Sequence, residues 1–437
     1  MTTETVLDNA ARARAAAGAL ASSSIEERNR ALMLMADRIE SDQAALLEAN
    51  KKDLEQAKTM LAEGTISDAA MSRLKLDEAK IKSITDGIRQ VASLDDPLGK
   101  VTLATELDKD LILERITCPL GVLAVIFESR PDALPQIVSL AIKTGNAVLL
   151  KGGREAEHSN KLLFDLLQKA LKEADLPVDS IALMTSREDV AAILKAEAYV
   201  DLIIPRGSNS LVRHIQENTK IPVLGHADGI CHMYLHEDAD CAMATNLVVD
   251  AKTQYPSACN ALETLLIHES LLTSHLPSIV AVLLARGVEI RLDEASYDAI
   301  SGNETKIGKA IGEDWDTEYC DLILSIKTVS SMEEAIDHIN RHGSGHTDCL
   351  VSADAEAFDC FFRRVNSAGV YHNVSTRFAD GFRYGFGAEV GIATGKLHPR
   401  GPVGLEGIVT YKYKLTGTGQ TVQEYSGSRQ FSHRSLI

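Results

Sequence analysis

One cysteine stands in a sequence context that suits nucleophilic chemistry. Cys259 ends a polar, proline-containing loop, Asp250-Ala-Lys-Thr-Gln-Tyr-Pro-Ser-Ala-Cys259, and an apolar run follows the loop closely. Such a loop can present a thiol to a cleft, where backbone amides of its own turn stabilise the attacking thiolate. A single cysteine is nevertheless more often a small buried hydrophobe than a nucleophile. The role of Cys259 therefore depends on what the rest of the chain supplies.

Two glycine-containing turns carry cations and are candidates for binding a nucleotide cofactor. The first is Val148-Leu-Leu-Lys151-Gly152-Gly153-Arg154, and the second is Ile203-Ile-Pro-Arg206-Gly207-Ser208-Asn209. Glycine lets the backbone approach a ligand closely, cations pair with phosphates, and free amides at the start of a helix attract pyrophosphate. One such turn alone is more often an ordinary loop with solvated charges. Two of them in consecutive strand–helix units favour a cofactor.

Two other patterns do not support a familiar site. The glycines of Gly385-Phe-Gly387-Ala-Glu-Val-Gly391 have the wrong spacing for the usual dinucleotide fingerprint, so this segment is interpreted as a tight loop. The histidines at 226, 232, 342 and 346 lack metal-ligand spacing. We expect no metal site and interpret these histidines as surface, packing or substrate-contact residues.

The elements that must position these residues follow from hydrophobic periodicity. The first hundred residues are mainly helical, with a capping box at Ser24-x-x-Glu27. From about Gly121 short apolar runs alternate with helical stretches, which is typical of βαβ units and a parallel sheet. Expected strands span 121–127, 146–150, 180–184 and 200–204, with helices near 131–143, 156–174, 187–196 and 207–218. A second α/β region runs from Asp238 to Ala393, with strands at 262–268, 322–329, 347–351 and 369–373.

Two segments are expected outside these regions. Thr105 to Cys118 contains a polar turn between short extended stretches and predicts a projecting hairpin that suits oligomerisation. The last twenty residues are rich in Gly, Ser, Gln and Thr and predict a surface tail.

Composition limits the class of protein. The chain has 437 residues, 45% of them hydrophobic, enough for two or three cores. Its 62 acidic residues outnumber 45 basic ones, and the net charge of −17 repels nucleic acid and anionic membrane surfaces. No apolar stretch predicts a signal peptide or a membrane span. The seven scattered cysteines favour reduced thiols, so we expect a cytoplasmic protein.

Several motifs follow one another along the chain. They are Phe127-Glu-Ser-Arg130-Pro131, Lys151-Gly-Gly-Arg-Glu, Ile204-Pro-Arg-Gly-Ser, the Cys259 segment, Ser375-Thr-Arg-Phe-Ala-Asp380 and Leu397-His-Pro-Arg400-Gly-Pro-Val-Gly-Leu-Glu406-Gly. Taken in this order, they closely resemble the motifs of the γ-glutamyl phosphate reductase (glutamate-5-semialdehyde dehydrogenase) family, within the aldehyde dehydrogenase superfamily. The resemblance extends from about residue 5 to Tyr413.

The resemblance implies an α/β, aldehyde dehydrogenase-like fold with two parallel-sheet α/β domains and a small β oligomerisation arm. It places an NADP-binding domain at 1–104 and 119–237 and a catalytic domain at 238–396. The oligomerisation arm would comprise 105–118 and 397–417, followed by a tail at 418–437.

The resemblance also implies a reaction, the second step of proline biosynthesis. The nucleophile attacks γ-glutamyl phosphate, phosphate leaves, and NADPH reduces the resulting thioester to glutamate 5-semialdehyde. Because the acyl phosphate is labile, we also expect a hand-over contact with a separate glutamate 5-kinase. A homo-oligomer is expected from the arm.

The matching positions supply the expected site residues. Cys259 is the nucleophile, and Ser129 takes the place of the superfamily's oxyanion-hole asparagine. A surface glutamate is the alternative interpretation of Glu318, which matches a ribose-binding position. The cofactor-binding residues implied are Lys151, Gly153, Arg154, Arg206, Gly207, Ser208 and Glu318. The residues implied for the substrate's two anionic groups are Arg130, Asn373, Ser375, Thr376 and Arg377.

Two departures from ordinary aldehyde dehydrogenases discriminate between functions. Hydrolytic relatives carry a Glu-Leu-Gly-Gly segment whose glutamate activates water, whereas this chain has Val223-Leu-Gly225-His226, and valine cannot act as a base. Arg154 stands where NAD-selective relatives often place a glutamate, and arginine suits a 2′-phosphate. The alternatives are a hydrolytic NAD(P)-dependent semialdehyde dehydrogenase and a non-catalytic regulatory relative.

Overall fold

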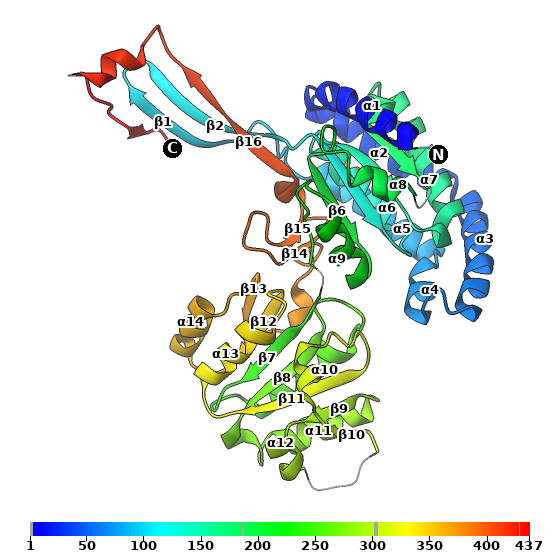
Figure 1. The fold of residues 1–437 in the computed structure, drawn as a ribbon, viewed down its shortest axis with the longest axis vertical. Coiled ribbons are helices and arrows are strands. Elements are labelled where there is room, and N and C mark those ends of the chain that lie inside the picture. Colours follow the sequence, from blue (N-terminus) through cyan, green and yellow to red (C-terminus); the bar gives the residue numbers. More distant parts are fainter. Residues whose placement is uncertain (1–2, 186–187, 227, 301–304, 428) are drawn as a thin grey trace. The chain divides into compact units, whose positions relative to one another are not determined.

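The computed structural model describes residues 3–185, 188–226, 228–300, 305–427 and 429–437. The chain forms two compact units (Figure 1). Unit 1 comprises Met1–Leu224, Phe386–Gly391 and Val403–Ile437, and unit 2 comprises Gly225–Gly385 and Ile392–Pro402. Each unit contains its own parallel sheet.

The α-helices alternate with strands along most of the chain. They are α1 (Thr3–Ala21), α2 (Ile25–Ser41), α3 (Gln43–Ala62), α4 (Asp68–Leu74), α5 (Glu78–Ser93), α6 (Ala133–Lys143), α7 (Glu157–Glu173), α8 (Glu188–Ile193), α9 (Asn209–Asn218), α10 (Cys241–Thr253), α11 (Leu276–Ala285), α12 (Glu294–Ala299), α13 (Met332–His342) and α14 (Ala355–Arg364). No helix within the described ranges is long and apolar enough to cross a membrane.

The strands fall into four sheets. They are β1 (Val101–Asp108), β2 (Leu111–Pro119), β3 (Val122–Phe127), β4 (Ala147–Lys151), β5 (Ile181–Met184), β6 (Leu202–Arg206), β7 (Cys231–Leu235), β8 (Leu262–His268), β9 (Glu289–Leu292), β10 (Ile307–Lys309), β11 (Ile323–Val329), β12 (Thr347–Val351), β13 (Gly369–His372), β14 (Gly391–Ala393), β15 (Gly401–Val403), β16 (Val409–Thr416) and β17 (Arg434–Ser435).

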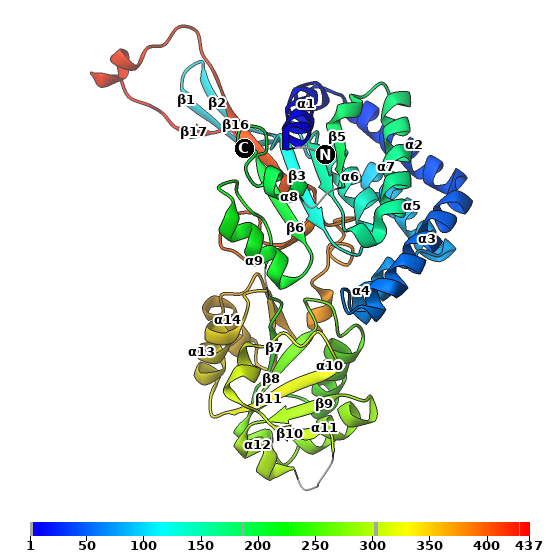
Figure 2. The ribbon, with the colours of Figure 1, turned by 45° about the vertical axis from the view of Figure 1, so that its right-hand side comes forward.

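Unit 1 is built around a parallel sheet of order β5-β4-β3-β6, which Figure 2 shows from a second side. Alternate residues of β3, including Val122 and Ala124, join one core cluster with α1 and α8. This alternation follows from the two-residue period of a strand. The predicted helices of the first hundred residues and the predicted strands of this region are confirmed, as is the capping box of Ser24 and Glu27 at the start of α2.

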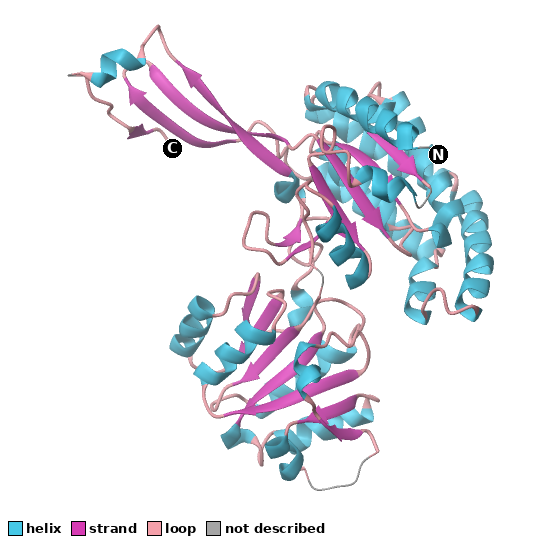
Figure 3. Ribbon diagram, viewed as in Figure 1, coloured by secondary structure: helices cyan, strands magenta, loops and turns pink. Residues whose placement is uncertain are grey.

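Unit 2 is built around a sheet of order β10-β9-β11-β8-β7-β12-β13, in which every pairing is parallel. Its central strands contribute to two core clusters, one on each face, and helices cover both faces (Figure 3). Met233 and Leu235 of β7 join the core cluster that includes α10 and α11. Tyr234, between them, joins the cluster that includes α13 and Phe361.

The structural division differs from the expected domain boundary. We expected the second domain to begin at residue 238, but β7 pairs with both β8 and β12 and lies inside the second sheet. The division between the units therefore falls between Leu224 and Gly225. Strands β7, β9 and β10 were not predicted. The short strands β9 and β10 give too few residues for a clear periodic pattern.

The projecting arm is an antiparallel sheet of order β16-β2-β1-β17. The predicted hairpin is confirmed as β1 and β2. The prediction of a plain surface tail is incomplete, because β17 pairs with β1 through Thr105 and Glu106. Arg434 also forms an ion pair with Glu106 at 2.8 Å. These contacts attach the end of the chain to the arm.

Candidate active site

Cys259 lies in the loop between α10 and β8, within unit 2. The loop folds on itself through backbone hydrogen bonds from Ala258 to Tyr255 (3.2 Å) and from Ala261 to Ala258 (2.9 Å). The Cys259 side chain is half-buried. The predicted placement of the thiol on a loop just before a buried strand is confirmed.

The environments of the cysteines separate Cys259 from the buried thiols. All seven cysteines are free. Cys231 and Cys349 are fully buried, and burial raises the pKa of Cys231 well above its usual range and that of Cys349 to about 12. Because only the thiolate is a strong nucleophile, these two thiols are inert at neutral pH.

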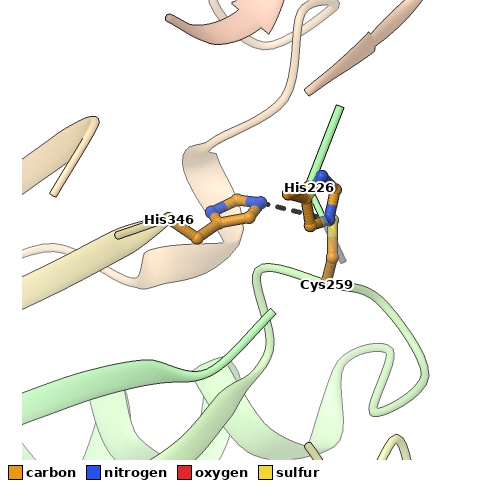
Figure 4. A group of neighbouring side chains, drawn as sticks. All are labelled: His226, Cys259 and His346. Atoms are coloured by element: carbon orange, nitrogen blue, oxygen red, sulfur yellow. Dashed lines mark hydrogen bonds between the residues drawn. The ribbon is translucent and has the colours of Figure 1, made fainter. Parts of the chain in front are cut away.

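Two histidines lie beside the Cys259 sulfur, as Figure 4 shows. His346 Nε2 is 3.3 Å from Cys259 Sγ, and its Nδ1 is 2.8 Å from the hydroxyl oxygen of Thr347. A hydroxyl can donate or accept, so Thr347 supports either tautomer of the ring. His346 can therefore exchange a proton with the thiol through Nε2.

His226 completes this group from a third loop. Its ring meets that of His346 edge to face, with centroids 5.3 Å apart. Nδ1 of His226 lies 3.0 Å from the carbonyl oxygen of Ile392. Since a carbonyl can only accept, Nδ1 carries the proton of the neutral ring and Nε2 carries the lone pair.

A buried ion pair joins the elements on either side of the Cys259 loop (residues 254–261). Lys252, in the last turn of α10, donates to Glu263 of β8 at 2.7 Å, and both side chains are fully buried. The backbone amide of Cys320 also donates to Glu263, at 3.3 Å. Burial raises the pKa of Glu263 to about 7, although Lys252 opposes that shift. The pair links the two ends of the loop that carries Cys259.

The short helix Thr376–Phe378 packs against the same loop, which brings together some of the predicted substrate residues. The Thr376 hydroxyl donates to the carbonyl of Asn260 at 2.7 Å. Arg377 donates through Nε to Gln254 at 2.9 Å, and its guanidinium lies over the ring of Tyr255. Burial lowers the pKa of Arg377. The Arg377 cation therefore lies close to the loop that carries Cys259.

Two other predicted substrate residues in this region are engaged by the protein itself. The Ser375 hydroxyl accepts from the amide of Arg377 at 3.3 Å. Asn373 accepts from the amide of Ser352 and donates to its carbonyl, at 3.0 and 2.8 Å. Its backbone has a positive φ of 55°, which asparagine tolerates. The Asn373 amide thus fixes a turn, and a substrate would have to displace these bonds.

Glu318 lies beside the loop that carries Cys259. A Cβ placed on Gly229 would lie 2.6 Å from Glu318 Oε1 and 2.7 Å from Cys259 Cα. Only glycine fits between these groups, because real Cβ atoms do not approach so closely. The Glu318 side chain is half-buried, and its role in binding the nicotinamide ribose stays a prediction.

The first glycine-containing turn of unit 1 contains an acceptor that sequence reasoning missed. Lys151 ends β4, and burial lowers the pKa of its amine. Arg154 is exposed, whereas Glu155 is buried and accepts from both the amide and the hydroxyl of Ser129, at 2.5 and 2.9 Å. A Cβ on Gly153 would collide with that carboxylate, 2.0 Å away. Arg130, the neighbour of Ser129, is half-buried.

The second turn of unit 1 also holds a carboxylate. Arg206 ends β6 and donates to the carbonyl of Glu389 at 3.3 Å. The amide of Ser208, at the start of α9, donates to Glu128 at 2.9 Å, and a Cβ on Gly207 would lie 2.4 Å from the same carboxylate. The prediction of free amides at this turn is therefore wrong for Ser208. The site does bind a negative charge at a helix N-terminus, as the helix dipole favours.

Comparisons with known proteins agree with this architecture. Residues 1–297 match the aldehyde dehydrogenase family. A γ-glutamyl phosphate reductase of Prochlorococcus marinus (strain MIT 9313) is 54% identical over 428 residues, covering 98% of this chain and 96% of the relative. One from Synechococcus elongatus is 54% identical over 423 residues, covering 96% of each. The crystal structure of the Thermotoga maritima γ-glutamyl phosphate reductase covers 95% of this chain and 99% of that one, with TM-score 0.90 and 35% identity.

The chain belongs to the aldehyde dehydrogenase family. Within it, the chain is a member of the γ-glutamyl phosphate reductases. The predicted resemblance and the aldehyde dehydrogenase-like fold are confirmed.

The contact between His346 and Cys259 predicts how fast the thiol reacts. In His346→Gln, alkylation of Cys259 by iodoacetamide at neutral pH should slow about tenfold, because glutamine cannot accept the thiol proton and the thiolate is the reactive form. Mass spectrometry of the Cys259 peptide gives the rate. His268→Gln, a change elsewhere in unit 2, is the matched control. Equal rates in wild type and His346→Gln would contradict this role for His346.

The buried Glu263 predicts a pH-dependent stability. Its pKa is about 7 in the folded protein against an ordinary value of 4.5, so the folded state holds a proton that the unfolded chain has released. This contribution to the free energy of unfolding is complete below 4.5 and is lost as the pH rises through about 7. Urea unfolding measured across this range should show a smaller loss in Glu263→Gln than in wild type. Exposed Glu294→Gln should behave as wild type, and identical slopes in all three proteins would refute the prediction.

Proposed function

We propose that this chain reduces γ-glutamyl phosphate to glutamate 5-semialdehyde, the reduction step of proline biosynthesis, using NADPH and a thioester on Cys259. The observation that carries the proposal is the half-buried Cys259 thiol with His346 Nε2 at 3.3 Å, in a chain 54% identical to γ-glutamyl phosphate reductases. A nucleophile within hydrogen-bonding distance of a base is the arrangement that covalent acyl transfer requires.

In the proposed reaction, Cys259 transfers its proton to His346 and its sulfur attacks the acyl carbon. Phosphate then leaves and a thioester remains on the sulfur. The backbone amide of Cys259 donates to the oxyanion that develops during attack, and the Ser129 hydroxyl is the second proposed donor. Ser129 must first exchange Glu155 for the substrate oxygen, because its hydroxyl is bonded to that carboxylate.

The residues of the two glycine-containing turns fit a phosphorylated cofactor. Gly153 and Gly207 let the backbone come close to the carboxylates of Glu155 and Glu128, nearer than a Cβ would allow. A cofactor phosphate would take the place of these carboxylates. When bound, the nicotinamide supplies the hydride that the reduction needs. The residues proposed to hold it are Lys151, Gly153, Arg154, Arg206, Gly207, Ser208 and Glu318. Exposed Arg154 is proposed to bind the 2′-phosphate that distinguishes NADP from NAD.

The substrate carries phosphate at one end and an α-carboxylate at the other, so two anion contacts are needed. Arg377 is the strongest candidate of unit 2, because it is buried beside the nucleophile loop and its bonds to Gln254 and Tyr255 fix its position. Ser375 and Thr376 belong to the same short helix. Arg130 is the proposed contact from unit 1. Asn373 is the weakest of the five proposed substrate residues, because its amide already bonds to the backbone of Ser352.

A hydrolytic function is disfavoured by Val223. This residue stands where hydrolytic relatives place a water-activating glutamate, and its side chain packs against the core of unit 1. It offers no base, so a thioester at Cys259 would persist until reduction or reaction with phosphate.

The proposal extends to the cellular setting. A cytoplasmic location accords with the seven free thiols. A homo-oligomer formed through the arm accords with exposed Tyr411, Tyr413 and Leu415 on β16. Direct transfer of the labile acyl phosphate from a separate glutamate 5-kinase is part of the same proposal.

The central test runs the reaction in reverse. The reverse substrate is pyrroline-5-carboxylate, the compound to which glutamate 5-semialdehyde cyclises. Wild-type protein given this compound and NADP should form NADPH only when inorganic phosphate is present, because phosphate must release the acyl group from sulfur. Cys259→Ala should lose activity, while Cys360→Ser should retain it. NADPH formation without phosphate would instead mean hydrolysis. Inactivity of the wild type with and without phosphate would favour a non-catalytic relative.

Cofactor preference gives a second test. Arg154→Glu should lower the ratio of NADPH to NADH efficiency by about 10–100-fold, which corresponds to losing a charged hydrogen bond of about 1.5–3 kcal/mol. Lys169→Glu makes the same change of charge at an exposed position on α7 and is the matched control. Steady-state kcat/KM for both cofactors measures the effect. An unchanged ratio in Arg154→Glu would remove the argument from this residue.

A further inference from the structure

The group around the nucleophile has the composition of a metal site. His226, Cys259 and His346 offer one ligand atom each, and these atoms all lie within 4.8 Å of one another. All three residues belong to unit 2, and they come from loops far apart in the sequence (Figure 4). A thiolate with two imidazoles suits Zn²⁺, whose catalytic sites commonly keep three protein ligands and one open position.

The hydrogen bonds of the two rings prepare them as ligands. A metal-binding histidine usually donates its other N–H to an acceptor, which fixes the tautomer and the direction of the ring. Nδ1 of His226 is 3.0 Å from the Ile392 carbonyl, which leaves the lone pair on Nε2. Nδ1 of His346 can donate to the Thr347 hydroxyl at 2.8 Å while Nε2 faces Cys259.

Only small movements separate this arrangement from a closed site. Metal–ligand distances of about 2.0–2.3 Å place tetrahedral ligand atoms roughly 3.5 Å apart. His346 Nε2 and Cys259 Sγ already lie at 3.3 Å. His226 and Cys259 are half-buried, and the three ligand atoms all lie within 4.8 Å of one another. No other group of this kind is present in the parts of the chain that the structure describes.

We propose that His226, Cys259 and His346 bind a soft divalent cation such as Zn²⁺, and that the bound cation reversibly blocks the nucleophile. Binding removes the thiol proton and places the sulfur lone pair on the metal, so the sulfur can no longer attack an acyl carbon. The inhibitory consequence rests on the proposed function of Cys259, whereas the metal site itself does not. The inference departs from the expectation of no metal, which rested on spacing along the chain.

Binding can be measured without any turnover. Metal-free full-length protein is titrated with Zn²⁺, and the alkylation rate of Cys259 by iodoacetamide is followed by peptide mass spectrometry. We expect a single Zn²⁺ per chain, slowing of at least about tenfold, and recovery with EDTA. Co²⁺ in place of Zn²⁺ should give the near-ultraviolet absorption of a thiolate–cobalt bond, which Cys259→Ser should abolish.

Variants decide whether the three residues act together. His226→Gln leaves the hydrogen bond between His346 and the Cys259 sulfur in place. It should nevertheless weaken Zn²⁺ protection by about 10–100-fold, because it removes one ligand. His346→Gln should weaken Zn²⁺ protection to a similar extent. For this variant, the alkylation rate with Zn²⁺ is compared with the rate of the same variant without metal. His268→Gln and Cys360→Ser should protect as wild type does. Equal protection in His226→Gln and wild type, or a cobalt spectrum that survives Cys259→Ser, would overturn the site.

The activity assay then separates the two proposals. Zn²⁺ should inhibit phosphate-dependent NADPH formation over the same concentrations that protect Cys259, and EDTA should restore it. Full activity with the cation bound would overturn the inhibitory role. If the wild type shows no reductase activity, the proposed function is wrong. The alkylation and cobalt measurements then still decide whether the metal site exists.

Discussion

Parallel pairing of three neighbouring strands is the constraint on which the surroundings of Cys259 depend. In unit 2, β7 lies between β8 and β12, with Cys231 opposite Leu262 and Met233 opposite Cys349. Parallel strands begin at the same edge of a sheet, so the loops that precede them meet there. His226, Cys259 and His346 all precede these strands. Their proximity is therefore a product of register and needs no nearness in sequence.

That register is held by buried polar groups. Asp348 of β12 accepts from both the amide and the ring Nδ1 of His232 on β7, at 2.7 and 3.1 Å, and both side chains are fully buried. The Lys252–Glu263 pair likewise joins α10 to β8 through buried polar groups. A buried pair of this kind costs desolvation and often adds little net stability, but removing one partner is expensive. Such contacts penalise a shifted register, which an apolar core alone tolerates more easily.

Sequence reasoning succeeded where the signal is local. The alternation of apolar runs predicted β3 to β6, and the local sequence correctly placed Cys259 on a loop directly before β8. It missed β7 and placed the domain boundary at residue 238, directly after that strand. It missed the partners of Cys259 because His346 lies 87 residues away, and no spacing rule connects the two. It also missed Glu128 and Glu155, since a carboxylate that fills an anion site has no distinctive sequence pattern.

Within each unit, the proposed functional residues lie at one end of the strands, and this end differs between the two units. In unit 1, Ser129, Lys151 and Arg206 follow or end parallel strands, where ligands of open α/β sheets usually bind. In unit 2, Cys259 and both histidines precede their strands. A neutral imidazole that accepts a thiol proton uses the same lone pair that a soft metal needs, so the arrangement that we propose to activate Cys259 also suits metal binding. The proposed sensitivity to such cations therefore follows from the proposed use of a cysteine and a histidine together.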